Sequence, residues 1–353
     1  MRVERIRPDS RPRVDLAGAV LTRDLRVGGE RWQKGRRLSA DDLAALAADT
    51  SGLPPGGVTV AVPEAGDLHE DEAALRLAAA VGGEGLTRRG PAESRVDLLA
   101  AVDGVLHVRT RELELLNRID PLEVFTAYDG SVVAPGDLVA SIKVAPHLVE
   151  EALVAAGERL TRDGRRPLVR VAAFRPMRVG VVVREVVRSV ARERFESSVR
   201  AKVESLGSTV VDIVYVDSDE AVEAALRRLI GERGDGGERV DLVLTAGGGS
   251  TDPLDPFFVA IDDLGGEIVR RGVPSHPGSM LWLGRVGRTA VLGLPTCGAY
   301  SKATAADLVL PRLLTGERPG PRLVSPLGHG GILTRNQRFR FPSYARDLDA
   351  PDG

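Results

Sequence analysis

The second half of the chain alternates short apolar runs with amphipathic segments. The apolar runs have the length of buried strands, and the segments between them repeat apolar residues at helical spacing. The runs are residues 179–183, 209–216, 240–245 and 289–292, and the helical segments are 190–206, 222–229, 256–264 and about 300–314. Strict alternation of strand and helix predicts a mostly parallel sheet with helices on both faces, a three-layer αβα domain within residues 169–318.

The first half has a different pattern. Strands are predicted at 14–21, 58–62, 96–102, 104–109 and 136–144, with helices at 39–47, 67–80 and 148–162. Ser39 and Asp42 have the spacing of a capping box. The pattern predicts an α+β, β-rich region over residues 1–168, divisible into two subdomains. Residues 319–353 are rich in proline, glycine and arginine without periodicity, and are expected to form an extended tail.

Three acids crowd the start of the helix predicted at 67–80. Glu70, Asp71 and Glu72 are consecutive. They have the chemistry of metal ligands, but acids in a first turn also complement the helix dipole. We therefore interpret them as charges of a solvated helix, with a metal site as the alternative.

Composition excludes several classes of function. The 353 residues carry a formal net charge of -2 and 4% aromatic residues, which gives no attraction to nucleic acid or anionic membranes and no base-stacking surface. A single cysteine excludes an internal disulfide and a cysteine zinc cluster. No stretch approaches the roughly 20 apolar residues that span a bilayer, and the N-terminus lacks an apolar signal core. We expect a cytoplasmic protein that binds neither nucleic acid nor membrane.

The predicted strand at 240–245 leads into a loop suited to bind a ligand. Gly247, Gly248 and Gly249 follow it, and Asp255 precedes Pro256 as an N-cap before a helix. Such loops lie at the carboxyl end of a parallel sheet, where ligands bind. A β-branched residue at Gly248 should resist a positive φ and block the approach of a ligand. A lone glycine loop is often only a tight turn, and its spacing fits neither the dinucleotide fingerprint nor a P-loop.

A second glycine loop and a Pro-Gly element make the pattern more specific. Gly293-Leu294-Pro295-Thr296 follows the strand at 289–292, and Pro277-Gly278-Ser279 lies between the two loops. The three elements together resemble the molybdopterin-binding domain of the MogA type. The chain is similar to MoeA-like molybdopterin-binding proteins of molybdenum cofactor biosynthesis, as a divergent member.

The resemblance implies a site for molybdopterin, its adenylylated form or molybdenum-loaded molybdopterin, with magnesium. It assigns metal binding and catalysis to Asp255, and a further metal-binding acid to Glu185. Asp252 stands where molybdotransferases commonly have glycine, and its carboxylate makes it a second candidate for metal binding and catalysis. It also implies a homodimer, molybdate as a further ligand, and a molybdoenzyme or biosynthetic protein as partner. The implied pterin-binding residues are Thr245, Gly247, Gly248, Gly249, Ser250, Thr251, Pro277, Gly278, Ser279, Gly293, Leu294, Pro295 and Thr296.

Several positions depart from the family pattern. Molybdotransferases carry a Thr-Gly-(Asp/Ser)-Glu element after the first strand; here the Thr-Gly is deleted at Arg184-Glu185, and Glu185 matches the acid of that element. His276 and Ser279 replace lysines near the Pro-Gly segment. Thr296 stands where the family has glycine, and Cys297 follows it. For Cys297, a small buried cysteine is favoured over a reactive thiol. Whether the chain is an enzyme is therefore left open. One hypothesis is a magnesium-dependent transferase that inserts molybdate and releases AMP; the alternatives are a non-catalytic cofactor carrier for a molybdenum hydroxylase and a nucleotide pyrophosphohydrolase of the CinA type.

Overall fold

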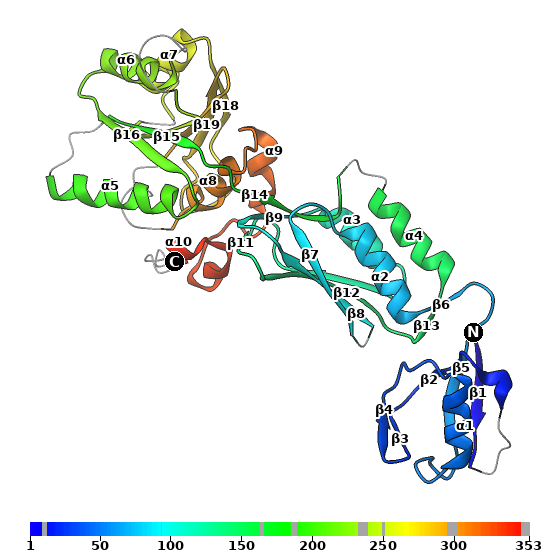
Figure 1. Cartoon of the computed structure of the whole chain (residues 1–353). Helices are drawn as coiled ribbons and strands as arrows, with labels where there is room; N and C mark the ends of the chain where they lie inside the picture. Colours follow the sequence, from blue (N-terminus) through cyan, green and yellow to red (C-terminus); the bar gives the residue numbers. More distant parts are fainter. Residues whose placement is uncertain are drawn as a thin grey trace. The chain divides into compact units, whose positions relative to one another are not determined.

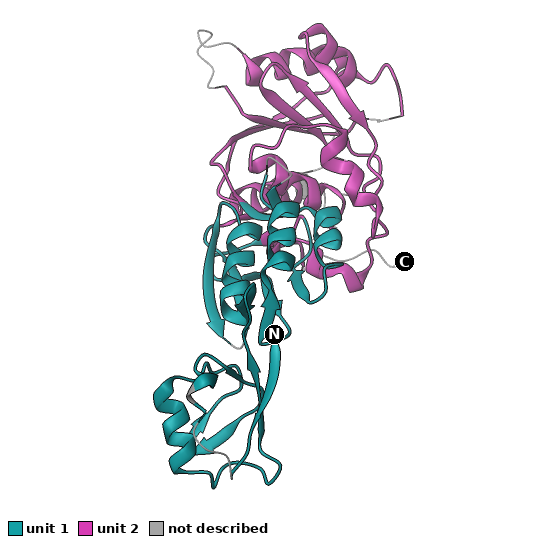
Figure 2. Ribbon diagram, turned by 90° about the vertical axis from the view of Figure 1, so that its right-hand side faces the viewer, with its two compact units in different colours: residues 1–102, 106–129, 133–171 teal, residues 103–105, 130–132, 172–353 magenta. Residues whose placement is uncertain are grey.

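The chain folds into two compact units (Figure 2). The computed structural model describes residues 1–8, 13–92, 94–162, 166–184, 189–231, 239–248, 251–294 and 303–346, with only the backbone at Val14 and at 189–191. Unit 1 comprises Met1–Val102, Leu106–Asp129 and Val133–Val171; unit 2 comprises Asp103–Val105, Gly130–Val132 and Ala172–Gly353. The chain passes between the units along the strands β9 (Gly104–Val108), β11 (Val132–Val133) and β14 (Val169–Ala173). The boundaries expected at 168 and 318 stay predictions.

The N-terminal part of unit 1 surrounds a small core of its own. A three-stranded antiparallel sheet in the order β1-β5-β2 packs with Leu16, Trp32, Leu43 and Leu46. Its elements are β1 (Arg2–Ile6), η1 (Val14–Leu16), β2 (Val20–Leu21), β3 (Leu25–Val27), β4 (Glu30–Trp32), α1 (Ala40–Ala48) and β5 (Val58–Val62). The capping box predicted at the start of α1 is confirmed, since the Ser39 side chain accepts from the Asp42 amide and Asp42 accepts from the Ser39 amide.

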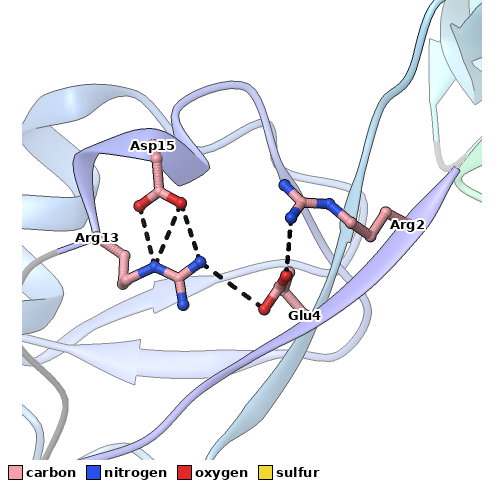
Figure 3. Close-up of polar contacts among 4 residues, drawn as sticks. All are labelled: Arg2, Glu4, Arg13 and Asp15. Atoms are coloured by element: carbon pink, nitrogen blue, oxygen red, sulfur yellow. Dashed lines mark hydrogen bonds and ion pairs between the residues drawn. The ribbon is translucent and has the colours of Figure 1, made fainter.

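The strand predicted over 14–21 is wrong for most of its length. Its first residues form the 3₁₀ turn η1, and Gly18 at φ 90° turns the chain before β2. Figure 3 shows how charge fastens this turn: Arg13 donates to Asp15 and pairs with Glu4 of β1, which Arg2 also contacts. The apolar residues of this run favour a strand in the sequence. In the structure, the turn η1 buries Leu16, so a turn satisfies the same apolar pattern.

The rest of unit 1 is built around an antiparallel sheet in the order β10-β12-β8-β7, with α2 packed on one face (Figure 1), and β13 and β6 form a separate two-stranded sheet. Alternate residues of β8 and β12 enter a core with Leu77 and Val81 of α2. The elements are β6 (Asp67–His69), α2 (Glu70–Val81), β7 (Leu86–Ala92), β8 (Arg95–Ala100), α3 (Thr110–Leu116), β10 (Leu122–Thr126), β12 (Leu138–Val144), β13 (Leu148–Glu150) and α4 (Glu151–Arg162). The predicted strands at 96–102, 104–109 and 136–144 are confirmed within two residues at either end.

Unit 2 is built on a six-stranded sheet in the order β16-β15-β17-β20-β19-β18. The first four strands are parallel, and β19 runs antiparallel to both of its neighbours. The elements are β15 (Arg178–Val183), α5 (Ser189–Glu204), β16 (Thr209–Tyr215), α6 (Asp219–Ile230), β17 (Leu242–Ala246), α7 (Pro256–Asp263), β18 (Glu267–Arg271), β19 (Trp282–Val286), β20 (Thr289–Gly293) and α8 (Ala306–Leu314).

The sheet of unit 2 has a core on each face. Val181 and Leu244 face a cluster with α5 and α8, whereas Val182 and Val243 face a cluster with α6 and α7. Because successive side chains of a strand point to opposite faces, strands covered on both sides are continuously apolar. This confirms the predicted α/β fold with its mostly parallel sheet between two helical layers.

The segment after α8 was expected to be an extended tail, but its described part is a series of short helical turns. These are α9 (Pro321–Val324), η3 (Ser325–Gly328), η4 (Arg335–Arg340) and α10 (Ser343–Arg346). Leu323, Leu333 and Phe341 join the core that contains α5 and α8. Burial of scattered apolar residues therefore orders a segment that has no helical periodicity.

Candidate functional site

The three central parallel strands of unit 2 are joined at their carboxyl ends by main-chain hydrogen bonds. The Arg184 amide donates to the Ala246 carbonyl at 2.9 Å, and the Leu294 amide donates to the Thr245 carbonyl at 2.8 Å. Thr245 is 2% exposed and pairs with Gly293 across β17 and β20. The two predicted glycine loops therefore leave the sheet from adjacent strands, at the edge where α/β sheets bind ligands.

Asp255 is the N-cap of α7, as its position before Pro256 predicted. Its Oδ1 accepts from the Phe257 amide at 2.9 Å, and the side chain is 3% exposed. Asp252 is exposed and forms a local turn, its Oδ1 accepting from the Leu254 amide at 2.9 Å. Thr251 beside it is also exposed. Both carboxylates thus hold the loop between β17 and α7 in shape.

Gly248 is required for its small size, and the positive φ expected there belongs to Gly247 at 89°. A Cβ on Gly248 would lie 2.9 Å from the Phe257 ring and 3.0 Å from a carboxylate oxygen of Asp255. The loop therefore folds closely over the start of α7. The glycine at 247 allows the turn, and the glycine at 248 allows the contact with α7.

The Pro-Gly element packs against the start of α8. The Ala305 amide donates to the Pro277 carbonyl at 2.9 Å, and Gly278 at φ 103° leaves no room for a Cβ beside Thr304 and Ala305. The carbonyl of Ser279 accepts from the Val273 amide at 2.9 Å. Pro277 and Gly278 thus lie against the residues that lead into α8, whereas Ser279 bonds back to Val273.

Gly293 and Leu294 serve the sheet and its core. A Cβ on Gly293 would lie 2.0 Å from the Trp282 ring, and Leu294 is 6% exposed with its amide bonded to Thr245. The Leu294 side chain is therefore part of the core, and its amide is already used in the hydrogen bond to Thr245. Five predicted residues lie outside the described residues: Glu185, Gly249, Ser250, Pro295 and Thr296, as does Cys297.

The described residues of the chain form no preformed metal centre. Within the described ranges, no three residues among His, Cys, Asp and Glu are grouped so that they could hold a metal ion. The part that Asp255, Asp252 and Glu185 take in metal binding therefore stays a prediction from resemblance.

A buried cluster of charged and polar side chains on α5, α8 and α10 was not predicted from the sequence. Lys202 of α5 pairs with Asp307 in the first turn of α8, and both side chains are at most 5% exposed. Asp307 also accepts from the Thr304 amide at 2.9 Å. Burial and the nearby Asp307 carboxylate raise the pKa of Tyr344 in α10 well above its usual value. The sequence signal for this cluster was Lys202, a single lysine within an apolar helical face. That signal predicts a buried ion pair only when the partner, Asp307, is known.

Unit 1 holds the acids that we interpreted as solvated, and that interpretation is wrong for Glu70. Glu70 is 5% exposed, and its Oε1 lies 3.0 Å from Nδ1 of His147. Asp71 and Glu72 line an open hollow of about 610 Å³ together with His69 and three arginines. A second open hollow of about 540 Å³ is also in unit 1, and neither is lined by a predicted pterin-binding residue.

The described part of unit 2 is a three-layer α/β domain in which the segments after β17 and β20 leave the carboxyl edge of the sheet side by side. Residues 179–315 match the family described as probable molybdopterin binding domain. This confirms the molybdopterin-binding domain that the two loops and the Pro-Gly element predicted, and it supports a role in molybdenum cofactor biosynthesis. No helix in the described part of the chain combines the length and apolarity needed to span a bilayer.

Other comparisons add little. A search of curated proteins gives no match. Among solved structures, the molybdopterin biosynthesis MoeA protein from Pyrococcus horikosii is 14% identical, covers 74% of this chain and 81% of its own, and has a TM-score of 0.29. A NadC deletion mutant is 15% identical, covers 55% of this chain and 78% of its own, and has a TM-score of 0.16. Both TM-scores are too low for the likeness to carry an argument.

Proposed function

We propose that unit 2 binds molybdopterin or its adenylylated form at the carboxyl edge of β15, β17 and β20. The observation that carries the proposal is the junction of two glycine-containing loops at adjacent parallel strands, tied by the Leu294 amide and the Thr245 carbonyl. Backbone amides at such loops bind anionic oxygen without a cation. Molybdopterin carries a phosphate and a polar ring system, which such a surface suits.

Two roles for the bound pterin follow from the residues. As a transferase, the protein would exchange AMP for molybdate with magnesium, using Asp255 and Asp252. As a carrier, it would hold the cofactor for a molybdenum hydroxylase. The carrier is favoured by the state of the two acids, because Asp255 is buried as a cap and Asp252 closes a turn. A catalytic role would place the metal on the second carboxylate oxygen of each acid, because these hydrogen bonds use Oδ1.

A calorimetric titration tests the proposal. Purified protein is titrated with molybdopterin and with its adenylylated form, with and without magnesium and molybdate. We expect binding of the pterin without release of AMP. Release of AMP on addition of molybdate would establish the transferase instead, and hydrolysis of the pyrophosphate without molybdate would point to the CinA type. Absence of binding would refute the proposed function.

Oligomeric state enters the proposal through resemblance only. We include a homodimer in it, and sedimentation velocity with and without the pterin tests that part separately. A single monomeric species under both conditions would remove the homodimer while leaving the pterin site intact. The partner molybdoenzyme is likewise a proposal, which depends on the carrier role.

A further inference from the structure

Arg184 lies at the carboxyl edge of the sheet, beside the glycine loop. It directly follows β15, the strand between β16 and β17. Its amide donates to the carbonyl of Ala246, the last residue before Gly247. Neighbouring strands are about 4.8 Å apart, so the backbone of Arg184 and the start of the glycine loop lie within the span of one small ligand at this edge.

Among the residues that the structure describes, one exposed acid, Asp219, holds the Arg184 guanidinium. Its Nε and Nη2 donate to Oδ1 of Asp219 at 2.8 and 2.5 Å, and the side chains are 34% and 59% exposed. Exposed ion pairs stabilise proteins little because water screens both charges. Both donors point to one oxygen, whereas a phosphate offers guanidinium two parallel hydrogen bonds. Asp219 can therefore be replaced by a ligand anion.

Asp219 does not depend on the arginine. It is the first residue of α6, directly after the N-cap Ser218, where the helix dipole favours a negative charge. Release of Arg184 therefore leaves Asp219 in a favourable position. The ion pair between Arg184 and Asp219 can therefore open when a ligand anion takes the place of Asp219 at the edge of the site.

The neighbouring cation at this edge is differently engaged. Arg192 of α5 lies 3.6 Å over the ring of Tyr215, the residue of β16 that pairs with Val183. The Tyr215 hydroxyl donates to Glu196 at 3.1 Å. A guanidinium stacked on an aromatic ring is held by that contact. Of these two described cations, Arg184 is therefore the one whose partner is more readily exchanged.

We propose that Arg184 determines specificity for the phosphate of the ligand, exchanging Asp219 for it on binding. The inference rests on the proposed function and deepens it: the ligand class is a phosphorylated pterin, and the phosphate is read at the end of β15.

The test uses the full chain and two probes, molybdopterin and molybdopterin dephosphorylated by phosphatase. Arg184→Ala should weaken binding of molybdopterin about tenfold, as expected for a charge-assisted hydrogen bond, and leave the dephosphorylated form unchanged. Arg184→Lys should recover only part of the loss, because lysine lacks the planar fork. Asp219→Asn should tighten binding of molybdopterin a few-fold and leave the dephosphorylated form unchanged.

The matched control is Arg228→Ala. Arg228 also forms an exposed pair with an aspartate, Asp212, but in the last turn of α6. It should change neither affinity. Equal binding of molybdopterin by Arg184→Ala and wild type would overturn the inference and leave the proposed function standing. An equal loss for both probes would overturn it too, since the phosphate would not be what Arg184 reads. Failure of the wild type to bind either probe would instead refute the proposed function, and the inference with it.

Discussion

Helices α2 and α7 both begin with a buried carboxylate, and the two acids are held in different ways. Asp255 caps α7 by accepting from an amide two residues along the chain. Glu70 at the start of α2 meets His147, 77 residues away. Its neighbour His69 is the N-cap, and the Nε2 of His69 lies 2.8 Å from the Gly35 carbonyl. One acid belongs to its own helix, and the other joins distant segments of unit 1.

The difference shows when an acidic helix start can be interpreted from sequence. A cap needs only residues a few positions apart, so Asp255-Pro256 is recognisable as a local motif. A pairing such as Glu70 with His147 depends on how β13 packs beside β6. Three consecutive acids therefore look alike in the sequence, although only Glu70 is buried.

The largest expected effect comes from closing the space between the glycine loop and α7. Gly248→Val should abolish pterin binding and lower the free energy of unfolding of unit 2 by about 3 kcal/mol, because its side chain would overlap Phe257 and Asp255. Urea denaturation and calorimetry measure the two effects. Gly320→Val is the control, since Gly320 has extended backbone and no atom within 4 Å of a Cβ. Retained pterin binding by Gly248→Val would show that the loop is only a turn.

Removal of the distant pairing should have the next largest effect. Glu70→Ala should lower the free energy of unfolding of unit 1 by about 2 kcal/mol, because it leaves the His147 ring without its partner in a mostly buried site. Glu72→Ala, in the same turn but with a half-exposed side chain, should change it by less than about 0.5 kcal/mol. Equal losses, measured by urea denaturation, would show that the two acids do not differ as proposed.

Two substitutions at Asp255 distinguish its role as the cap of α7 from a role of its carboxylate charge in catalysis. Asp255→Ala should lower the stability of unit 2 by about 1 kcal/mol through loss of the cap, while pterin affinity stays within a few-fold. It should also abolish any magnesium-dependent turnover. Asp255→Asn keeps the cap and removes the carboxylate, so stability should return without turnover. Turnover unchanged in both variants would refute the catalytic assignment.

The smallest effect on stability is expected for an exposed ion pair whose contribution depends on pH. Glu158 of α4 accepts both Nε and Nη2 of Arg76 in α2, and these hydrogen bonds lower its pKa although burial opposes the shift. A carboxyl with a lowered pKa in the folded state contributes stability above its unfolded pKa of about 4.3, and this is lost as pH falls through the folded value. Glu158→Gln should remove about 0.5 kcal/mol at pH 7 and less at pH 3. Thermal unfolding at both pH values measures this; an equal loss at pH 3 would contradict it.

Much of unit 2 was predictable because its elements follow local rules. The continuous apolar runs of β15, β17 and β20 predicted strands buried on both faces, and the glycines after β17 predicted the loop. The strand expected over 14–21 failed because a turn can bury the same residues as a strand. The turns that follow α8 could not be predicted, because Leu323, Leu333 and Phe341 are ordered by packing on other elements.

The sequence by itself determined the α/β class of unit 2 and the cap of α7, since periodicity and capping act between residues a few positions apart. The resemblance of its motifs predicted the domain that the family match at 179–315 supports. The tertiary structure decided which charges are buried and with which partners. Lys202 and Asp307 are 105 residues apart, and Arg184 and Asp219 are 35 apart. Such pairs form because packing brings their elements together at a sheet edge or in a core, and local pattern does not encode that proximity.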